Sequence, residues 1–174
     1  MQKTPRVLVL MRHAKAQQFA PTDHERELEP RGRRDATDAG SWLALHEIEC
    51  DYALVSSAAR TISTWEAVAQ AADWELDPDV DDSLYAAGPE TALDVIRSLP
   101  DDATSVLLIG HNPTVAYLAQ LLDDGDGDAD SISEMSQGYP TCALTVFDYE
   151  GDWADLEMGV ARVTGFHVGR DPRA

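Results

Sequence analysis

Several features that identify particular protein classes are scarce in this chain of 174 residues. Basic residues number 13 against 32 acidic ones, so the formal net charge is −19. This surplus of negative charge repels nucleic-acid phosphates and argues against DNA or RNA as a partner. Long apolar runs are scarce too: "SVLLIG", residues 105–110, is far shorter than the roughly 20 residues that cross a bilayer. We therefore expect no membrane partner either.

Cysteine is limited to Cys50 and Cys142, which lie far apart rather than in a C-x-x-C pair. This usage favours two reduced thiols in a cytoplasmic protein over a disulfide. The N-terminal stretch has an apolar run of only five residues and no small-residue cleavage pattern, so no secretory signal is expected. The His and Cys residues lack the spacing of zinc ligands, and we expect neither a metal nor a cofactor.

The chain does contain an alternation of short apolar runs and amphipathic stretches, which is typical of an α/β fold with a mostly parallel central sheet between layers of helices. Its length and its hydrophobic fraction of 44% favour a single domain over residues 1–174. The expected strands are Val7–Met11, Tyr52–Val55, Val106–Ile109, Ala143–Phe147 and Gly159–Val163. The expected helices cover 31–48, Thr61–Ala72, Gly88–Leu99 and Thr114–Leu122.

The acidic segment "DDGDGDADS", residues 123–131, partly resembles a calcium-binding loop. An EF-hand loop that began at Asp124 would have Asp126 and Asp128 at its third and fifth positions. It would also require glycine where Ala129 stands and glutamate where Met135 stands. We therefore expect a solvated surface loop.

Basic and imidazole side chains follow three of the predicted strands. Arg12 and His13 come directly after the first strand, Arg60 lies shortly after the second, and His111 follows the third. In an open parallel sheet, the carboxyl ends of the strands lie along one edge, where ligands bind. We therefore expect these four side chains to converge there.

The starts of two predicted helices add to the positive potential at this edge. Asn112 is expected to cap a helix with Pro113 at its first position, and Arg60 lies just before or within the first turn of another. Free N–H groups and the positive end of the helix dipole favour an anion at such a place. Two guanidinium groups and two imidazoles beside these helix starts predict a site for a dianion, of which phosphate is the first candidate.

Each of these residues has a simpler interpretation when it is taken alone. Arg12 could be an exposed surface cation, His13 a buried structural histidine, and His111 a helix cap. The recurrence of the same residue types at three strand ends is what favours a common site. The remaining histidines, which follow no predicted strand in this way, are His24, His46 and His167.

The motifs around these residues resemble those of the histidine phosphatase superfamily, which includes the phosphoglycerate mutases. "MRHAKA", residues 11–16, resembles its Arg-His-Gly/Ala signature, "SSAARTISTW", residues 56–65, its second motif, and "GHNP", residues 110–113, its third. "RELEPRGRRDA", residues 26–36, and the short length are similar to SixA-type phosphohistidine phosphatases. The second motif departs from the family pattern at Ser57, where proline is usual, and at Ser63, where glutamine is usual. The resemblance implies a three-layer, phosphoglycerate mutase-like fold.

The resemblance also implies a chemistry. His13 would attack phosphorus and carry a covalent phosphohistidine intermediate. Arg12, Arg60 and His111 would bind the phosphoryl oxygens and stabilise their charge in the transition state, so that no metal is required. Lys15 could contribute to the positive field at the mouth of the site or be a solvated neighbour. Thr141 and Cys142 approach the site in the family, but the sequence gives them no chemical role.

The leaving group separates the subfamilies. Enzymes that expel an alkoxide position a carboxylic acid to protonate it, whereas an imidazole leaves as a neutral ring. In the family, the acid usually lies in the segment that here contains four candidates: Asp81, Asp82, Tyr85 and Glu90. None of the four matches the motif of the acid, and they could equally be solvated loop residues. The absence of a matching acid favours a phosphorylated histidine as the substrate. The short connection between Trp65 and Val106 leaves little room for a lid, which favours a substrate on a partner protein.

We therefore predict a phosphohistidine phosphatase. The family resemblance implies that its partner is a histidine-containing phosphotransfer protein. Two alternatives remain open at this point. The protein could be a phosphatase of a small phosphoester metabolite with the same nucleophile. It could also be a phosphoprotein-binding module without catalytic activity, although the presence of both His13 and His111 argues against this.

Overall fold

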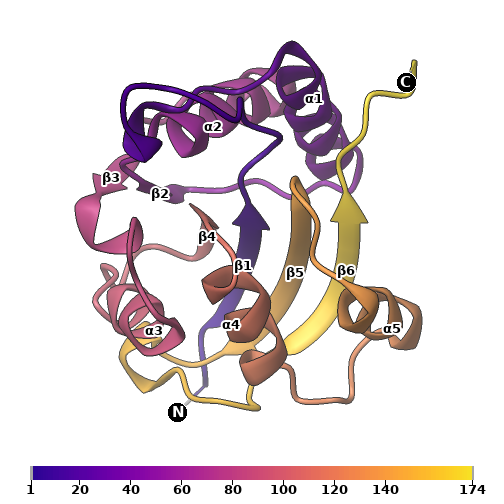
Figure 1. The fold of residues 1–174 in the computed structure, drawn as a ribbon. Helices are drawn as coiled ribbons and strands as arrows, with labels where there is room; N and C mark the ends of the chain where they lie inside the picture. The colour runs from indigo at the N-terminus through magenta and orange to yellow at the C-terminus, as the bar shows by residue number, and fades with distance from the viewer. Residues whose placement is uncertain (1, 174) are drawn as a thin grey trace.

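The computed structural model describes residues 2–173, in which a six-stranded sheet lies between two layers of helices (Figure 1). The strands are β1 (Pro5–Arg12), β2 (Tyr52–Ser56), β3 (Asp79–Asp81), β4 (Ser105–Gly110), β5 (Ala143–Glu150) and β6 (Arg162–Val168). The α-helices are α1 (Pro30–Leu45), α2 (Ala59–Ala72), α3 (Pro89–Arg97), α4 (Thr114–Leu122) and α5 (Ala129–Gln137). Short 3₁₀ helices are η1 (Asp23–Glu25), η2 (Asp82–Leu84) and η3 (Trp153–Asp155).

The strand order is β3-β2-β4-β1-β5-β6. The pairs among β1 to β4 are parallel, whereas β5 runs antiparallel to both β1 and β6. Central parallel strands are covered on both faces, which explains the uninterrupted apolar runs of β1 and β4. The predicted α/β class with a mostly parallel sheet is confirmed.

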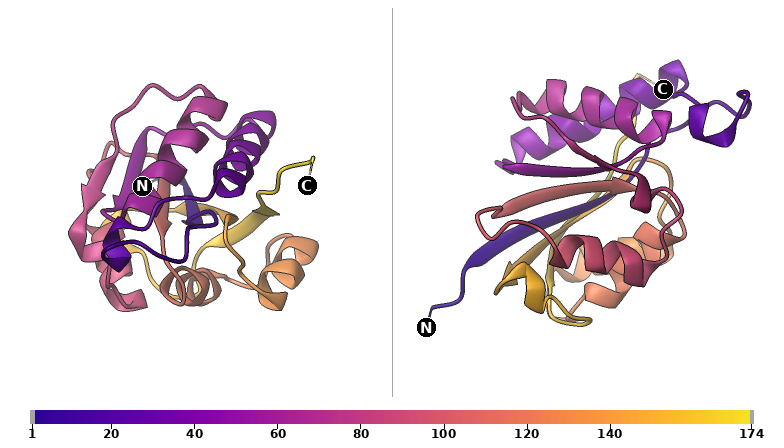
Figure 2. Two further views of the ribbon diagram at one scale, coloured as in Figure 1. Left: turned by 45° about the horizontal axis from the view of Figure 1, so that its top comes forward. Right: turned by 90° about the vertical axis from the view of Figure 1, so that its left-hand side faces the viewer.

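The two faces of the sheet support two separate hydrophobic clusters. In β1, Leu8 and Leu10 pack into the cluster that includes α3 and α4, whereas Val9 and Met11 pack into the cluster that includes α1 and α2. This alternation follows from the period of two along a strand. Figures 1 and 2 show α1 and α2 over one face and α3, α4 and α5 over the other, which gives the three layers.

The structure corrects several boundaries. Strand β3 was not predicted because its three residues contain a single apolar side chain between two aspartates. The last predicted strand, Gly159–Val163, lies too early, because β6 begins at Arg162 and continues to Val168. Helix α4 begins at Thr114 with Pro113 as its N-cap, so the prediction of Asn112 as the cap was wrong.

The acidic segment of residues 123–131 is a surface turn followed by the unpredicted helix α5. The carboxylates of Asp123 and Asp124 each accept a hydrogen bond from the backbone N–H two residues ahead, at 2.8 Å. Asp128 caps α5 by accepting from the N–H and the hydroxyl of Ser131. The carboxylates therefore stabilise turns, in the manner typical of aspartate.

Cys50 and Cys142 are both buried and free. Within residues 2–173, no helix is at once long and apolar enough to cross a membrane.

Candidate active site

A cavity of about 360 Å³, which we call the strand-end cavity, is lined by the residues that end or follow β1 and β4 and by Arg60 of α2. Arg12 pairs with Gly110 across β1 and β4, and the His13 N–H donates to the Gly110 carbonyl at 3.1 Å. The rings of His13 and His111 therefore approach to 5.4 Å between centroids. The residues that line the strand-end cavity are Arg12, His13, Lys15, Ala16, Gln18, Arg26, Glu29, Arg60, His111, Asn112 and Thr141.

His13 is held in one orientation by its own backbone neighbour. Its Nδ1 lies 2.7 Å from the carbonyl oxygen of Ala14. Since a carbonyl can only accept a hydrogen bond, the ring proton resides on Nδ1 and the lone pair on Nε2 is free. Burial is the main cause that lowers the pKa of His13 to about 3, and the charges of neighbouring cations act in the same direction. The hydrogen bond to Ala14 partly offsets this decrease. The ring is thus neutral at physiological pH.

Residues around His13 fix its backbone. The N–H of Ala14 donates to the Thr64 hydroxyl at 3.0 Å, and that hydroxyl donates to the Arg60 carbonyl at 2.7 Å. The His13 carbonyl accepts from the N–H of Cys142 at 3.0 Å. Thr64 therefore couples the β1 end to the first turn of α2, a connection that the sequence motifs did not indicate.

Within residues 2–173, the Arg12 side chain forms a hydrogen bond through one of its nitrogens. Its Nη1 donates to the Tyr139 carbonyl at 3.1 Å, and the Asn112 side chain donates to the same oxygen at 2.7 Å. Its Nε is buried and, among the described residues, has no hydrogen-bond partner. Burial lowers the pKa of Arg12.

Arg60 is buried and occupies the second position of α2, which begins two residues before the predicted start at Thr61. Of the two placements left open, just before the helix or within its first turn, the second holds. Its Nη1 donates to the backbone carbonyl of Asp23 at 2.9 Å, and its Nη2 lies 3.2 Å from the Asp23 carboxylate. The guanidinium also lies 5.9 Å from the centre of the Tyr85 ring. Its Nε is buried and finds no partner in the part of the chain that the structure describes.

His111 is oriented by Ser56, the last residue of β2, whose hydroxyl lies 2.7 Å from Nε2. The other ring nitrogen, Nδ1, is buried without a partner among residues 2–173. Burial is the main cause that lowers the pKa of His111 to about 4, and the charge of Arg60 adds to it. The ring therefore lies neutral beside His13, with the edge of Tyr85 against it at 5.7 Å between centroids.

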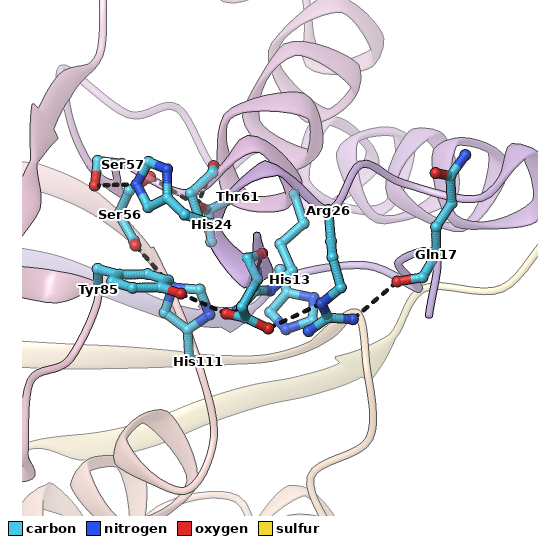
Figure 3. A network of polar contacts seen from close by, with 12 residues as sticks. His13, Gln17, His24, Arg26, Ser56, Ser57, Thr61, Tyr85 and His111 are labelled. Atoms are coloured by element: carbon cyan, nitrogen blue, oxygen red, sulfur yellow. Dashed lines mark hydrogen bonds and ion pairs between the residues drawn. The ribbon is translucent and has the colours of Figure 1, made fainter. Parts of the chain in front are cut away.

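The loop between β1 and α1 supplies residues that sequence reasoning missed (Figure 3). Asp23 accepts hydrogen bonds from Tyr85 and from Arg26, whose Nη1 also donates to the Gln17 carbonyl. His24, which was predicted to lie in this loop but not to contact the site, lies 2.9 Å from the Ser57 hydroxyl and forms a T-shaped pair with the Tyr85 ring. Ser57, the departure from the family proline, therefore contacts the loop.

The four candidates for a general acid occupy different places. The Asp81 carboxylate accepts from the N–H and hydroxyl of Ser83 at the start of η2. Asp82 and Glu90 are exposed and are not among the residues that line the strand-end cavity. Tyr85 alone of the four contacts the residues of the site, and its hydrogen bond to Asp23 is the main cause that raises its pKa.

Lys15 and Thr141 both line the strand-end cavity, and Lys15 is exposed at its mouth. The Lys15 backbone lies against the first turn of α1: a Cβ at Gly32 would be 2.1 Å from the Lys15 carbonyl oxygen. The other two histidines lie outside the cavity, His46 stacked on Trp42 and His167 bonded to Asp38.

Known proteins share these motifs and this fold. A family model of the histidine phosphatase superfamily (branch 1) matches residues 8–85. The phosphohistidine phosphatase SixA homolog of Haemophilus influenzae is 30% identical over 146 residues, which are 68% of this chain and 89% of that protein. The chain belongs to the histidine phosphatase superfamily and is of the SixA type. An uncharacterized Mycobacterium tuberculosis protein is 37% identical over 167 residues, which cover 92% of this chain and 100% of that one.

Solved structures of the superfamily extend the likeness over nearly the whole chain. The SixA protein of Nakamurella multipartitia matches with a TM-score of 0.84 at 32% identity, covering 97% of this chain and 99% of that one. The protein histidine phosphatase SixA complexed with tungstate matches with a TM-score of 0.76 at 22% identity over 94% and 97% of the two chains, which supports the fold. Membership of this superfamily makes a phosphatase activity the starting point for the function.

Proposed function

We propose that this SixA-type protein removes phosphate from a phosphorylated histidine of a partner protein through a covalent intermediate on His13. The observation that carries the proposal is the state of His13: its Nδ1 proton is bound by the Ala14 carbonyl, and its free Nε2 belongs to a neutral ring. A nucleophilic imidazole requires both features.

The reaction divides into two displacements at phosphorus. In the first, the Nε2 lone pair of His13 attacks phosphorus, and the P–N bond to the substrate imidazole breaks with its electron pair returning to that ring. The substrate ring carries a proton on its other nitrogen and therefore leaves as a neutral imidazole. In the second, water attacks the phosphohistidine, the P–N bond to His13 breaks, and inorganic phosphate leaves while the water proton passes to the phosphate or to solvent. His13 is regenerated neutral.

Three further side chains have atoms free to bind the phosphoryl oxygens. These atoms are Nε of Arg12, Nε of Arg60 and Nδ1 of His111, which among the described residues are buried without partners. A donation from the Ser56 hydroxyl to Nε2 of His111 leaves the ring proton on Nδ1, which makes it a donor. Two guanidinium charges supply the stabilisation that a metal ion supplies elsewhere, so we expect turnover to persist in EDTA.

The surroundings of the cavity support a protein as the substrate. Between α2 and β4 the chain forms only β3, η2 and α3, and none of their residues lines the strand-end cavity. The loop that follows β1 projects beyond the carboxyl end of that strand (Figure 2, right). It presents Phe19 with 84% of its surface exposed, next to Gln18, which lines the cavity. An exposed aromatic ring beside an open phosphate site fits contact with a protein surface.

The deciding experiment traps the intermediate. The protein is incubated briefly with ³²P-labelled phosphohistidine peptide, quenched in base, and the labelled residue is mapped. We expect label on His13 that survives alkali and is lost in acid, and no label in His13→Ala. Label on another residue, or turnover that persists in His13→Ala, would contradict the proposal.

A substrate panel separates the proposed reaction from hydrolysis of small phosphoesters. We expect kcat/KM for a phosphohistidine peptide to exceed that for sugar and nucleotide monophosphates by at least about tenfold. Preference for a phosphoester would replace the substrate assignment and leave the role of His13 intact. Tight binding of phosphopeptide without release of phosphate, unchanged in His13→Ala, would identify a binding module.

A further inference from the structure

The carboxylate of Asp23 is the strongest feature of the site that the proposed reaction leaves without a role. It belongs to η1, and 55% of its side chain is exposed. It borders the strand-end cavity through its contacts with Arg26 and Arg60, which both line that cavity. Three side chains converge on it, from the residue after η1, from α2 and from the residue after η2. Tyr85 donates to Oδ2, Arg60 lies 3.2 Å from the same oxygen, and Arg26 donates to Oδ1 at 2.9 Å.

These contacts keep Asp23 both ionised and fixed in place. The hydrogen bond from Tyr85 is the largest cause that holds the pKa of Asp23 well below its usual range, and the Arg26 hydrogen bond and the Arg60 charge act in the same direction. Arg26 is itself tied to the Gln17 carbonyl on the other side of the loop at 2.9 Å. A negative charge is therefore built rigidly into the mouth of a site that binds an anion.

The resting state of Arg60 is set by the same residue. Both of its terminal nitrogens bond to Asp23, one to the backbone carbonyl and one to the carboxylate. Its Nε is buried and has no partner among the described residues, and each terminal nitrogen retains a second N–H. A phosphoryl group that binds a second N–H of either terminal nitrogen lies close to the Asp23 carboxylate, and the two negative charges then compete for the same guanidinium.

We propose that Asp23 determines specificity: its carboxylate competes with the phosphoryl group for Arg60 and then discriminates between leaving groups by their charge. This inference rests on the proposed function, because it assumes a phosphoryl group bonded to His13 at the floor of the cavity. The leaving group of an in-line displacement then departs on the side opposite His13, toward the mouth, where Asp23 lies. A carboxylate there accepts an N–H from an imidazole and repels a group that carries its own negative charge.

The first test measures anion binding without turnover. Binding of vanadate is measured by calorimetry in the native protein, in Asp23→Asn and in Asp23→Ser. Removal of the competing charge is expected to lower the dissociation constant of vanadate about fivefold, the change that one charge contact near water produces. If both variants bind vanadate more weakly than the native protein, Asp23 serves to hold Arg60 in place and the proposal is overturned.

The second test measures discrimination with two substrates that share a phenolic leaving atom. They are 4-carboxyphenyl phosphate and 4-(aminomethyl)phenyl phosphate. The native protein is expected to favour the cationic substrate in kcat/KM, and Asp23→Asn is expected to reduce that ratio about fivefold or more. Intrinsic reactivity cancels because the ratio is compared between proteins. An unchanged ratio would overturn the proposal.

Glu25 provides the matched control. It is an exposed carboxylate on the same 3₁₀ turn as Asp23. Glu25→Gln removes the same charge and is expected to leave both the vanadate constant and the substrate ratio within about twofold of native values. If it reproduces the changes in Asp23→Asn, the effect is one of overall charge and the proposal fails. Absence of turnover on every substrate would instead contradict the proposed function, while the vanadate comparison would still decide the role of Asp23.

Discussion

At the scale of single residues, the site depends on hydrogen bonds that decide where protons reside. His13 and His111 are two imidazoles within 5.4 Å, and two arginines line the same cavity. Two protonated rings at that distance, close to two permanent cations, would repel one another strongly. Burial and this repulsion keep both rings neutral. The proposed reaction requires this state, because one ring attacks phosphorus and the other donates a hydrogen bond.

The first prediction concerns the protonation of His13. Its pKa of about 3, against 6.5 for a free side chain, means that the folded ring stays neutral while the unfolded ring takes up a proton. The folded state therefore loses stability as the pH falls from 6.5 toward 3. Long-range ¹H–¹⁵N NMR at pH 5.5 is expected to show His13 neutral with its proton on Nδ1, the signal being assigned by its loss in His13→Asn. A titration midpoint near 6.5 would contradict this.

The second prediction concerns Thr64, which positions His13 without touching substrate. Its hydroxyl accepts from the Ala14 N–H and donates to the Arg60 carbonyl. Thr64→Val keeps the shape but leaves the buried N–H unpaired, which costs about 1–3 kcal/mol. We expect kcat to fall with little change in KM, and Thr64→Ser, which retains the hydroxyl, to restore it. Equal kcat in the valine and serine variants would show that the hydroxyl does not act through His13.

At the scale of elements, the segment between β1 and α1 joins the nucleophile to the rest of the site. Its base is closed by backbone bonds from Gln17 to Glu27, at 2.8 Å, and from Glu29 to Lys15, at 3.0 Å. The first turn of α1 packs directly on this base through Gly32. The position of the loop is thus set by how closely the helix approaches it.

The third prediction tests that approach. A Cβ at Gly32 would lie 2.1 Å from the Lys15 carbonyl oxygen, so Gly32→Ala must displace the helix or the loop. We expect a loss of about 1–3 kcal/mol in the free energy of unfolding, measured by urea denaturation, together with lower kcat. Gly88→Ala is the control, because a Cβ there meets nothing within 4 Å, and it should cost less than about 1 kcal/mol. Equal losses in the two variants would refute the packing argument.

The fourth prediction tests the exposed aromatic residue of the same loop. Phe19→Ala is expected to lower kcat/KM for a phosphohistidine protein or helical peptide about fivefold or more, because one aromatic residue at an interface contributes about that much to binding. The kcat/KM for free phosphohistidine should stay within about twofold of the native value. Leu45→Ala is the matched control, since Leu45 is 80% exposed at the end of α1 and does not line the cavity. A similar effect on small and large substrates would mean that Phe19 does not contact the partner.

The sequence could predict the elements with strong patterns and could not predict the contacts of the loop. β1, β2 and β4 are apolar runs, and their ends carry Arg12, His13 and His111, so convergence followed from parallel pairing. Strand β3 and the start of β6 lack such runs. The positions of Asp23 and His24 depend on side-chain bonds to Arg60 and Ser57, and no periodicity in the intervening segment encodes them.

At the scale of the whole molecule, the distribution of charge is uneven. Residues 12–34, which include the loop over the cavity, carry six basic and four acidic residues, whereas the whole chain has 13 and 32. The remaining surface is therefore strongly negative, whereas four basic side chains line the strand-end cavity: Arg12, Lys15, Arg26 and Arg60. An anion is therefore favoured at this cavity and repelled by the rest of the surface.

The fifth prediction follows from the self-repulsion of a net charge of −19. The screening length shortens from about 30 Å at 0.01 M salt to about 3 Å at 1 M, so salt removes most repulsion between distant carboxylates. We expect Tm, followed by circular dichroism, to rise by about 2–4 °C for each kcal/mol of repulsion removed. NaCl and KCl should act equally, because the effect depends on ionic strength. A Tm that falls with salt would mean that attractive pairs such as Arg6 with Asp152, 3.5 Å apart, outweigh the repulsion in the folded state.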